Sequence, residues 1–220
     1  MKKIYLASKS PRRQILLSQI NIDFEIIDIE IDESVNRGEI PLNYVRRMSI
    51  EKAKAGWDSE KKINDISVLA ADTSIAINDK ILGKPEGRKN AHEMLSFLSG
   101  KTHQVITCVS LILPNFSGVK KERQETTDRG GIDKLNMKTI DSITNVSFMD
   151  LSSSNIEEYL KTDEWIGKAG SYAIQGYAAK YIKAIEGSYS GVVGLPLYET
   201  NQLLNSVRSE HSLNEMKCEV

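Results

Sequence analysis

Residues that build covalent frameworks and metal centres are scarce in this sequence of 220 residues. Its two cysteines, Cys108 and Cys218, lack the C-x-x-C spacing of redox or zinc sites. A disulfide framework is therefore not expected, and a reducing compartment is the default. The three histidines form no H-E-x-x-H or similar pattern, so they predict no metal centre.

Long apolar runs and an excess of positive charge are missing as well. The N-terminal segment begins with two lysines, but its apolar run ends at Ser8 and is too short for a signal peptide or a membrane span. We therefore expect a cytoplasmic protein without membrane contacts. The formal net charge of −1 provides no global positive field for nucleic acid. Phosphate recognition must then depend on a local cluster of Lys and Arg, which favours a small anionic ligand.

Hydrophobic residues make up 40 % of the chain, which suffices for a core, and they follow alternating strand and helix patterns. Runs typical of strands occupy residues 4–7, 24–31, 66–71, 105–113, 140–148 and 181–185. Helical spacing and capping residues predict helices over 10–20, 41–56, 91–100, 152–160 and 196–204. The alternation predicts an α/β or α+β domain of sheet and helices. The length fits one large α/β domain or two closely packed lobes that share a cleft.

Two polar segments fall outside this alternation. Residues 114–137 carry both charges and a Gly130-Gly131 pair, which predicts a long surface loop or the tip of an extended hairpin. Residues 207–220 form a polar tail that we expect to be disordered.

The first strand leads directly into a candidate phosphate site. Ser10 is a natural N-cap and Pro11 a natural first helical residue, so a strand, a tight turn and a helix N-terminus follow one another. The free N–H groups and the dipole of such a terminus suit a phosphate. Ser8, Ser10, Arg12 and Arg13 add hydroxyl and guanidinium donors. Residues 8–13 also fit a simpler interpretation, a capped helix whose two arginines are solvated.

Asp72 and Thr73 come at the end of the apolar run 66–71. The carboxyl end of a buried strand is where α/β sheets usually place their ligands. Asp72 is thus a candidate for binding Mg²⁺ or for accepting the proton of an attacking water. The alternative is that Asp72 only terminates the strand, as aspartate does in many turns.

Further polar residues allow a binding role or an ordinary surface role. Lys84 is held between Gly83 and Pro85 and would serve a phosphate as a point charge. Lys52 and Lys54 on the second helix are equally ambiguous, and Glu33 is either a metal ligand or a loop acid. Gln175, followed by Gly176, offers both a donor and an acceptor to a base edge. A P-loop and a G-x-S-x-G elbow are both absent from the sequence, which argues against a P-loop ATPase and a serine hydrolase.

Five collinear segments together resemble the Maf family in order and spacing. They are LASKSPRRQILL at 6–17, EKAKAG at 51–56, LAADTSI at 69–75, ILGKPEGRKNAHEMLSFLSGKTHQVITCVSL at 81–111 and KAGSYAIQGYAAKYIKAIEGSYSGVVGLPLYET at 168–200. The resemblance implies a single α/β domain over residues 1–206, with a fold like that of Maf proteins and inosine triphosphate pyrophosphatases. In this fold a mixed twisted sheet has flanking helices, and two lobes surround a central cleft. It also implies hydrolysis of nucleoside triphosphates to the monophosphate and pyrophosphate, with Mg²⁺ or Mn²⁺ as cofactor, and a homodimer.

The resemblance also assigns roles to individual residues. Asp72 matches the family's proton acceptor and, with Glu33, lies close to the metal. The phosphate-binding segment S-x-S-P-R-R corresponds to Ser8, Ser10, Arg12 and Arg13. Glu33, Lys54 and Lys84 correspond to polar positions that line the family's cleft. Arg13, Thr73 and Gln175 correspond to positions that govern substrate choice.

Gln175 separates the family's branches. The Y-x-I-Q-G form is similar to the branch that acts on dTTP and UTP, whereas the branch that acts on 7-methyl-GTP has Glu at this position. A neutral amide pairs with the carbonyl and imide N–H of a pyrimidine, while a carboxylate suits a cationic methylated guanine. The alternatives are a pyrophosphatase of the 7-methyl-GTP branch and a nucleotide-sensing regulator of cell division without catalytic activity.

The chain departs from the family pattern at four places. Thr73 is followed by Ser74-Ile75-Ala76 instead of a purely β-branched run. Ala71 stands where Gly usually precedes the A-D-T motif, a small change. Ala173 replaces the Gly of Y-G-I-Q-G, which adds strain if that position needs a positive φ. The polar stretch at 114–137 is longer than usual in the family.

The branch assignment makes a prediction. Replacing the amide at position 175 with a carboxylate (Gln175→Glu) should weaken the preference for dTTP and UTP, because the donor to the pyrimidine carbonyl is lost. Measuring kcat/KM over a panel of nucleoside triphosphates checks it, and an unchanged substrate profile would count against this role of Gln175.

Overall fold

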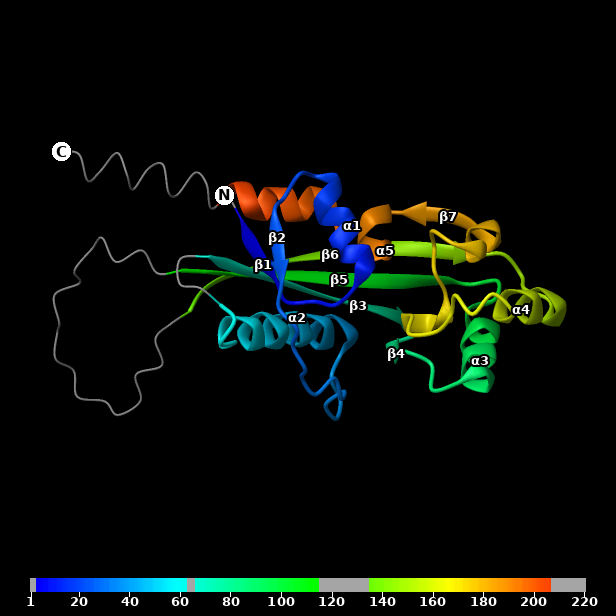
Figure 1. The fold of residues 1–220 in the computed structure, drawn as a ribbon. Helices are drawn as coiled ribbons and strands as arrows, with labels where there is room; N and C mark the ends of the chain where they lie inside the picture. The colour runs from blue at the N-terminus through cyan, green and yellow to red at the C-terminus, as the bar shows by residue number, and fades with distance from the viewer. Residues whose placement is uncertain (1–2, 63–65, 115–134, 207–220) are drawn as a thin grey trace, which may run out of the picture.

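The computed structural model describes residues 3–62, 66–114 and 135–206 and contains one seven-stranded sheet (Figure 1). Six strands follow the order β2-β1-β3-β5-β6-β7, and β4 pairs with β3. The strands are β1 (Ile4–Leu6), β2 (Phe24–Ile26), β3 (Ser67–Ile77), β4 (Lys80–Leu82), β5 (Thr102–Leu113), β6 (Asn136–Phe148) and β7 (Ile182–Glu186). Strands β2, β1 and β3 are parallel and the other pairs are antiparallel. The predicted mixed sheet is confirmed.

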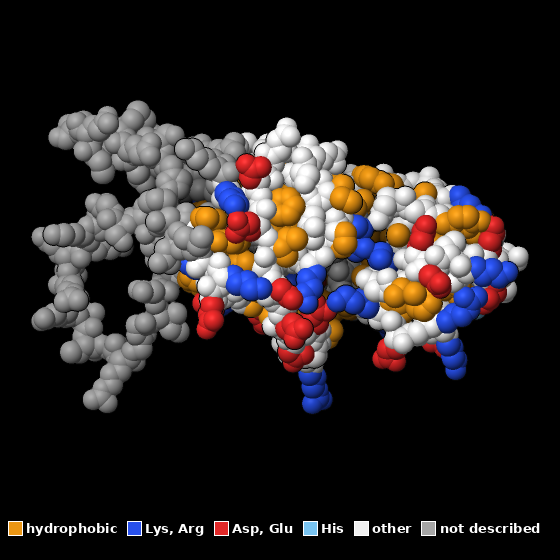
Figure 2. All heavy atoms as spheres, in the orientation of Figure 1, with side chains coloured by type: hydrophobic (Ala, Val, Ile, Leu, Met, Phe, Trp, Pro, Cys, Tyr) orange, Lys and Arg blue, Asp and Glu red, His pale blue; other side chains and the backbone are white. Residues whose placement is uncertain are grey.

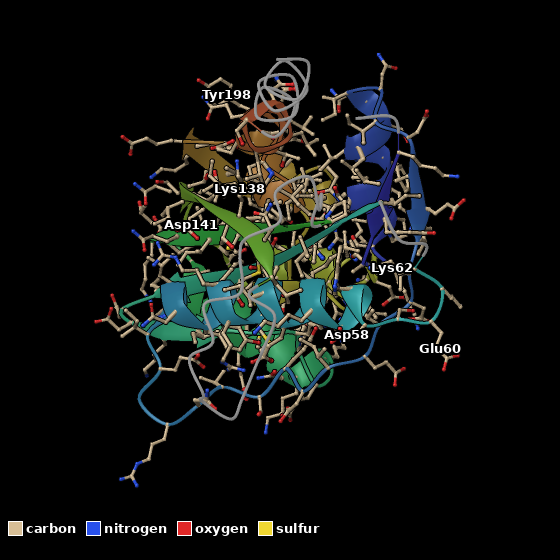
Figure 3. The ribbon with its side chains drawn as sticks, turned by 90° about the vertical axis from the view of Figure 1, so that its left-hand side faces the viewer. Asp58, Glu60, Lys62, Lys138, Asp141 and Tyr198 are labelled. Atoms are coloured by element: carbon tan, nitrogen blue, oxygen red, sulfur yellow. The ribbon has the colours of Figure 1, made fainter. Side chains whose placement is uncertain are left out.

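Helices cover both faces of this sheet. They are α1 (Pro11–Gln19), α2 (Pro41–Trp57), α3 (Arg88–Leu98), α4 (Ser153–Leu160), α5 (Tyr189–Val193), a helix over 197–206, and the 3-10 turns η1 (Ala169–Ser171) and η2 (Tyr177–Tyr181). Helix α2 lies along one face, and α1, α5 and the 197–206 helix lie on the other (Figure 1). The view from the side shows the same layers, with α2 below the sheet (Figure 3). None of the described helices is both long and apolar enough to cross a membrane.

The apolar residues form separate clusters on the two sides and at one end. Leu17, Leu69 and Leu195 belong to the cluster under α1 and the 197–206 helix, and other residues of β3 and β5 pack against α2. A further cluster joins the ends of β3, β5 and β6 to α3 and α4, the second lobe of the molecule. All residues of β3 except Thr73 are buried, as expected for a central strand covered on both faces.

Two strands differ from the sequence-based expectation. The apolar run 66–71 does not end at Asp72: β3 continues to Ile77, and Asp72 lies in its middle, opposite Cys108 of β5. The prediction that Asp72 ends a strand is therefore wrong. Strand β2 stops at Ile26 instead of continuing to residue 31, because its only partner, the three-residue β1, offers no further backbone groups to pair with.

Most of the segment 114–137, predicted as a long loop or the tip of an extended hairpin, lies outside the described residues. Strands β5 and β6 are antiparallel neighbours, paired from Thr102 opposite Ser147 to Leu113 opposite Asn136. The connection itself, residues 115–134, lies outside the described residues, as does the predicted tail at 207–220.

Gly56 has a different role from the helix stop that its sequence position suggests. Helix α2 continues through it to Trp57, and Gly56 is buried against the sheet. A Cβ atom at this position would lie 2.7 Å from Cβ of Ala7 and 2.9 Å from Cγ1 of Val68. The glycine therefore lets α2 approach β1 and β3 closely. Lys52 lies one turn earlier on the same face of the helix, so this approach also brings Lys52 to the sheet.

The close approach predicts the sign of a stability change. Gly56→Ala should lower the free energy of unfolding by about 1–3 kcal/mol, because the added methyl group forces α2 away from the sheet. A glycine that affected only helix propensity would give the opposite sign, a gain of roughly 0.5–1 kcal/mol. Urea denaturation of the two proteins decides between the two effects.

Candidate functional site

A cavity of about 920 Å³ opens between the two lobes. Its walls come from the turn before α1, the segment before α2, the middle of β3 and the loops around residues 167–175 and 192–194. Figure 2 shows Lys and Arg side chains gathered near the middle of this face of the molecule. The cavity is therefore a local cationic site on a chain of nearly neutral net charge.

Arg13 connects three walls of the cavity. Its Nε donates to the carbonyl oxygen of Gly194 at 2.9 Å, its Nη1 to Oγ of Ser8 at 3.2 Å and its Nη2 to Oγ1 of Thr73 at 3.4 Å. Burial lowers the pKa of Arg13, while the charge of Asp72 acts to raise it. The guanidinium is thus held in place before any ligand arrives.

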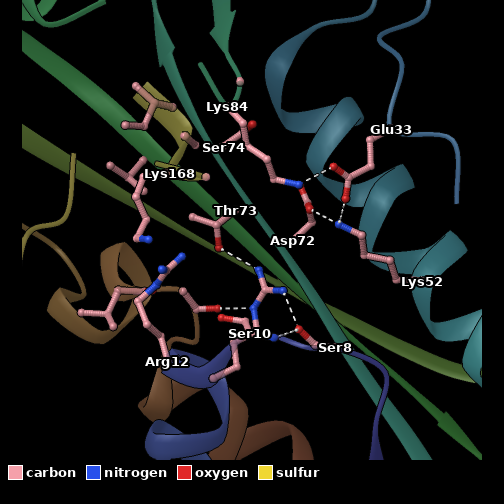
Figure 4. Close-up of a pocket in the computed structure, with 18 of the residues that line it drawn as sticks. Ser8, Ser10, Arg12, Glu33, Lys52, Asp72, Thr73, Ser74, Lys84 and Lys168 are labelled. Carbon is pink, nitrogen blue, oxygen red and sulfur yellow. Dashed lines mark hydrogen bonds and ion pairs between the residues drawn. The ribbon is translucent and has the colours of Figure 1, made fainter. Parts of the chain in front are cut away.

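Arg12 and Lys168 approach the same part of the cavity from opposite walls (Figure 4). Arg12 Nε donates to the carbonyl oxygen of Val193 at 3.1 Å, which leaves its other nitrogens for a ligand. Burial lowers the pKa of both side chains, and for Lys168 the charge of Arg12 lowers it further. Two neighbouring cations without a carboxylate between them are a ready site for an anion.

The N-terminus of α1 faces these cations. Ser10 occupies the N-cap position, but its side chain caps no backbone N–H, and its own N–H donates to Oγ of Ser8 at 3.2 Å. Pro11 is the first helical residue, as predicted, and the first turn of α1 contains no acidic residue. The positive end of the helix dipole is therefore available to a phosphate group.

A chain of alternating charges forms the other half of the site. Lys52 Nζ lies 2.7 Å from Oδ1 of Asp72 and 2.7 Å from Oε1 of Glu33, and Lys84 Nζ lies 2.7 Å from Oε2 of Glu33. Figure 4 shows the four side chains linked in the order Asp72, Lys52, Glu33 and Lys84 along the cavity wall. Asp72 and Lys52 are each 8 % exposed, so this ion pair is buried and weakly screened.

Electrostatics shifts the pKa of Glu33 and of the neighbouring Tyr44. Burial by itself raises the pKa of Glu33, but hydrogen bonds from Lys52 and Lys84 and their charges outweigh it and bring the pKa down to about 2. Burial raises the pKa of Tyr44 to about 12, and the charges of Asp72 and Glu33 act in the same direction. Tyr44 therefore stays protonated and donates its hydroxyl to the carbonyl oxygen of Glu33 at 3.0 Å.

The carboxylates do not form a metal site by themselves. The described residues contain no group of three or more His, Cys, Asp or Glu side chains that could hold a metal ion. Lys52 lies between Asp72 and Glu33, and both oxygens of Glu33 contact lysines. Asp72 engages only Oδ1 within the described part of the chain, which leaves Oδ2 for a ligand. This donor set fits Mg²⁺, which is usually bound by one or two carboxylates together with phosphates and water.

Nearly all residues predicted from the sequence line this one cavity. The members are Ser8, Ser10, Arg12, Arg13, Glu33, Asp72, Thr73, Lys84 and Gln175. Lys54 is the exception: it is exposed on α2, and Lys52 faces the cavity in its place. Two positions along a helix correspond to a rotation of about 200°, so only one of the two lysines can face the sheet.

Lys168 was not identified as a candidate from the sequence. Its signal was its place at the start of the K-A-G motif, where it precedes a tight turn. That turn contains Gly170 and Ser171, both with positive φ. Ala173 is not among the described non-glycine residues with positive φ, so its replacement of the family's glycine brings no backbone strain.

The fold and the cavity define an α/β protein with a preorganised cationic site beside a buried carboxylate. The profile of the Maf-like protein family matches residues 3–207, and the chain belongs to this family.

Curated relatives cover almost the whole chain. It is 44 % identical over 209 residues to a protein of Pseudoalteromonas atlantica named dTTP/UTP pyrophosphatase, with 94 % of this chain and 98 % of the relative covered. Proteins of the same name from Chromobacterium violaceum and Yersinia pestis are 43 % and 39 % identical, covering 92 % and 93 % of this chain and 93 % of each relative.

Among solved structures, the Staphylococcus aureus Ham1 protein matches with a TM-score of 0.36 and 15 % identity. The match covers 68 % of this chain and 73 % of that one.

The two lysines of α2 provide a test of the site. Lys52→Met should lower the free energy of unfolding by about 3 kcal/mol, because it leaves the buried carboxylate of Asp72 without its partner. Lys54→Met changes an exposed side chain on the same helix and should alter stability by less than about 0.5 kcal/mol. Equal effects in urea denaturation would contradict the assignment of Lys52.

Proposed function

We propose that this protein is a nucleoside triphosphate pyrophosphatase that hydrolyses dTTP and UTP to the monophosphate and pyrophosphate. One observation carries the proposal: Asp72 and the cations Arg12, Arg13, Lys84 and Lys168 line a single cavity. The family membership and relatives named dTTP/UTP pyrophosphatase, about 40 % identical, support it.

The cations bind and orient the triphosphate. Arg12, Lys168 and the N-terminus of α1 face one part of the cavity and suit the phosphates nearest to them. Arg13 is held by Ser8 and Thr73, so it presents a fixed guanidinium and loses little freedom when it binds. Charge that accumulates on the phosphoryl oxygens in the transition state is stabilised by these preorganised donors.

Asp72 accepts a proton from the attacking water. The water oxygen forms a bond to a phosphorus of the α–β anhydride, the bridging P–O bond breaks, and pyrophosphate leaves. Lys52 holds Asp72 through Oδ1, which leaves Oδ2 available to the water. A base positioned in this way contributes roughly 10²–10⁴ in rate.

A divalent cation fits this reaction. Asp72, with Glu33 beside it, would hold Mg²⁺ or Mn²⁺ together with phosphate oxygens and water. The bound ion would neutralise phosphate charge and acidify water.

Gln175 selects the base. It is exposed on the cavity wall beside Ile174, and its amide offers the donor and acceptor that a pyrimidine's carbonyl and imide N–H require. Arg13 and Thr73, which are hydrogen-bonded to each other, complete the set of residues assigned to substrate choice.

Asp72→Asn tests the reaction and the base together. The amide cannot accept the proton, so kcat for dTTP and UTP should fall by at least about 10²-fold with the fold retained. Pyrophosphate release is measured with and without Mg²⁺ or Mn²⁺, and circular dichroism checks folding. Asp79→Asn is the control, because it changes an aspartate in the β3–β4 turn whose positive φ asparagine also tolerates.

Two results would contradict the proposal. Near wild-type turnover in folded Asp72→Asn would remove Asp72 from the role of base. Nucleotide binding by the wild-type protein without any pyrophosphate release would instead support a nucleotide-sensing regulator.

A further inference from the structure

The turn that carries Gln175 has a support that neither the sequence nor the family assignment identifies. Gln175 is exposed and makes no hydrogen bond within the described part of the chain. Its position in the cavity wall is therefore set by the backbone of residues 174–177, and whatever holds that backbone also places the amide.

Besides the turn's own bond from the N–H of Gly176 to the carbonyl oxygen of Ala173 at 3.0 Å, two hydrogen bonds to the α4 region hold this backbone, one on each side of Gln175. The N–H of Ala173 donates to the hydroxyl of Tyr159 on α4 at 3.1 Å. The N–H of Tyr177 donates to Oε2 of Glu164 at 2.8 Å. The second bond is charge-assisted, and such bonds are stronger than those between neutral groups.

Gly176 shows how closely the carboxylate of Glu164 approaches. A Cβ atom at residue 176 would lie 2.6 Å from Cδ and 2.8 Å from Oε1 of Glu164. The φ of Gly176 is −107°, a value that any residue adopts. A methyl group at residue 176 would therefore displace the carboxylate of Glu164, and the backbone conformation itself does not demand glycine.

The loop that carries Glu164 is anchored at the C-terminus of α4. The N–H of Glu164 donates to Oγ1 of Thr162 at 3.2 Å, and the hydroxyl of Thr162 donates to the carbonyl oxygen of Tyr159 at 2.8 Å. Trp165 Nε1 donates to the carbonyl oxygen of Leu160 at 3.1 Å. Glu164 therefore links the C-terminus of α4 to the 174–177 turn.

The same carboxylate acts on the phosphate side of the cavity. Its charge raises the pKa of Lys168, which burial and Arg12 lower. Glu164 itself is not among the residues that line the cavity. It is placed to affect the base and the phosphates without touching either.

We propose that Glu164 is a positioning residue for base selection, whose carboxylate holds the 174–177 turn so that Gln175 meets the pyrimidine. The inference rests on the proposed function, because selectivity exists only if the cavity hydrolyses nucleotides. A purely structural role for Glu164 would reduce the activity on all nucleotides alike.

The test measures kcat and KM for dTTP, UTP, CTP and GTP. Glu164→Ala should lower kcat/KM for dTTP and UTP about tenfold, mainly through KM, and should narrow their advantage over CTP and GTP. Glu164→Gln keeps an acceptor for the N–H of Tyr177 and should restore most of the selectivity. Glu157→Ala, which removes an exposed glutamate of α4 that pairs with Arg88, is the control and should change nothing.

Gly176 supplies a second, independent arm. Gly176→Ala should reduce the selectivity in the wild-type background, because the methyl group and the carboxylate of Glu164 compete for the same space. In the Glu164→Ala background the same change should reduce the selectivity by less than about a further twofold, since the carboxylate that the methyl group would displace is absent. Gly87→Ala, where a Cβ atom meets nothing within 4 Å, controls for glycine replacement as such.

The outcomes separate this inference from the function on which it rests. A wild-type protein that hydrolyses neither dTTP nor UTP overturns the proposed function. If the wild type is active and selective, an unchanged ratio of kcat/KM values in folded Glu164→Ala overturns the role of Glu164 alone. Should that variant fail to fold, wild-type selectivity in Gly176→Ala overturns it instead.

Discussion

The buried ion pair between Lys52 and Asp72 is the interaction on which the site depends. A carboxylate in the middle of a central strand is costly unless a partner compensates its charge, and Lys52 is that partner at 2.7 Å. The lysine reaches the strand because Gly56, one turn later, lets α2 pack closely on β1 and β3. Lys52 also binds Glu33, and through it the segment before α2 becomes a wall of the cavity.

The phosphate side of the cavity is held together by the protein's own carbonyl groups. Arg12 and Arg13 donate to Val193 and Gly194 at the end of α5, which fixes α1 against a segment about 180 residues further along the chain. Arg12 keeps both Nη nitrogens for a ligand, whereas those of Arg13 also donate to Ser8 and Thr73. The groups that would bind substrate thus also join distant parts of the chain, and the site is rigid before substrate enters.

Much of the architecture follows from local patterns. The helix starts at Pro11 and Pro41 and the short helix α4 agree with expectation. The ends of β3 and β2 were predicted wrongly, because they depend on contacts with other elements of the fold. Strand β3 continues through Asp72 because Lys52, from another element, compensates the charge, and β2 ends early because β1 is short.

The sequence by itself determined the element types, the family and nine residues of the cavity, because helix caps, apolar periods and short motifs are local properties of the chain. Only the tertiary structure decided which lysine of α2 serves Asp72, since rotation about the helix axis is fixed by packing at Gly56. It also decided that Lys168 joins Arg12 and that Glu164 supports the turn of Gln175. These contacts join different parts of the fold, and no local pattern encodes the distance between two side chains that only folding brings together.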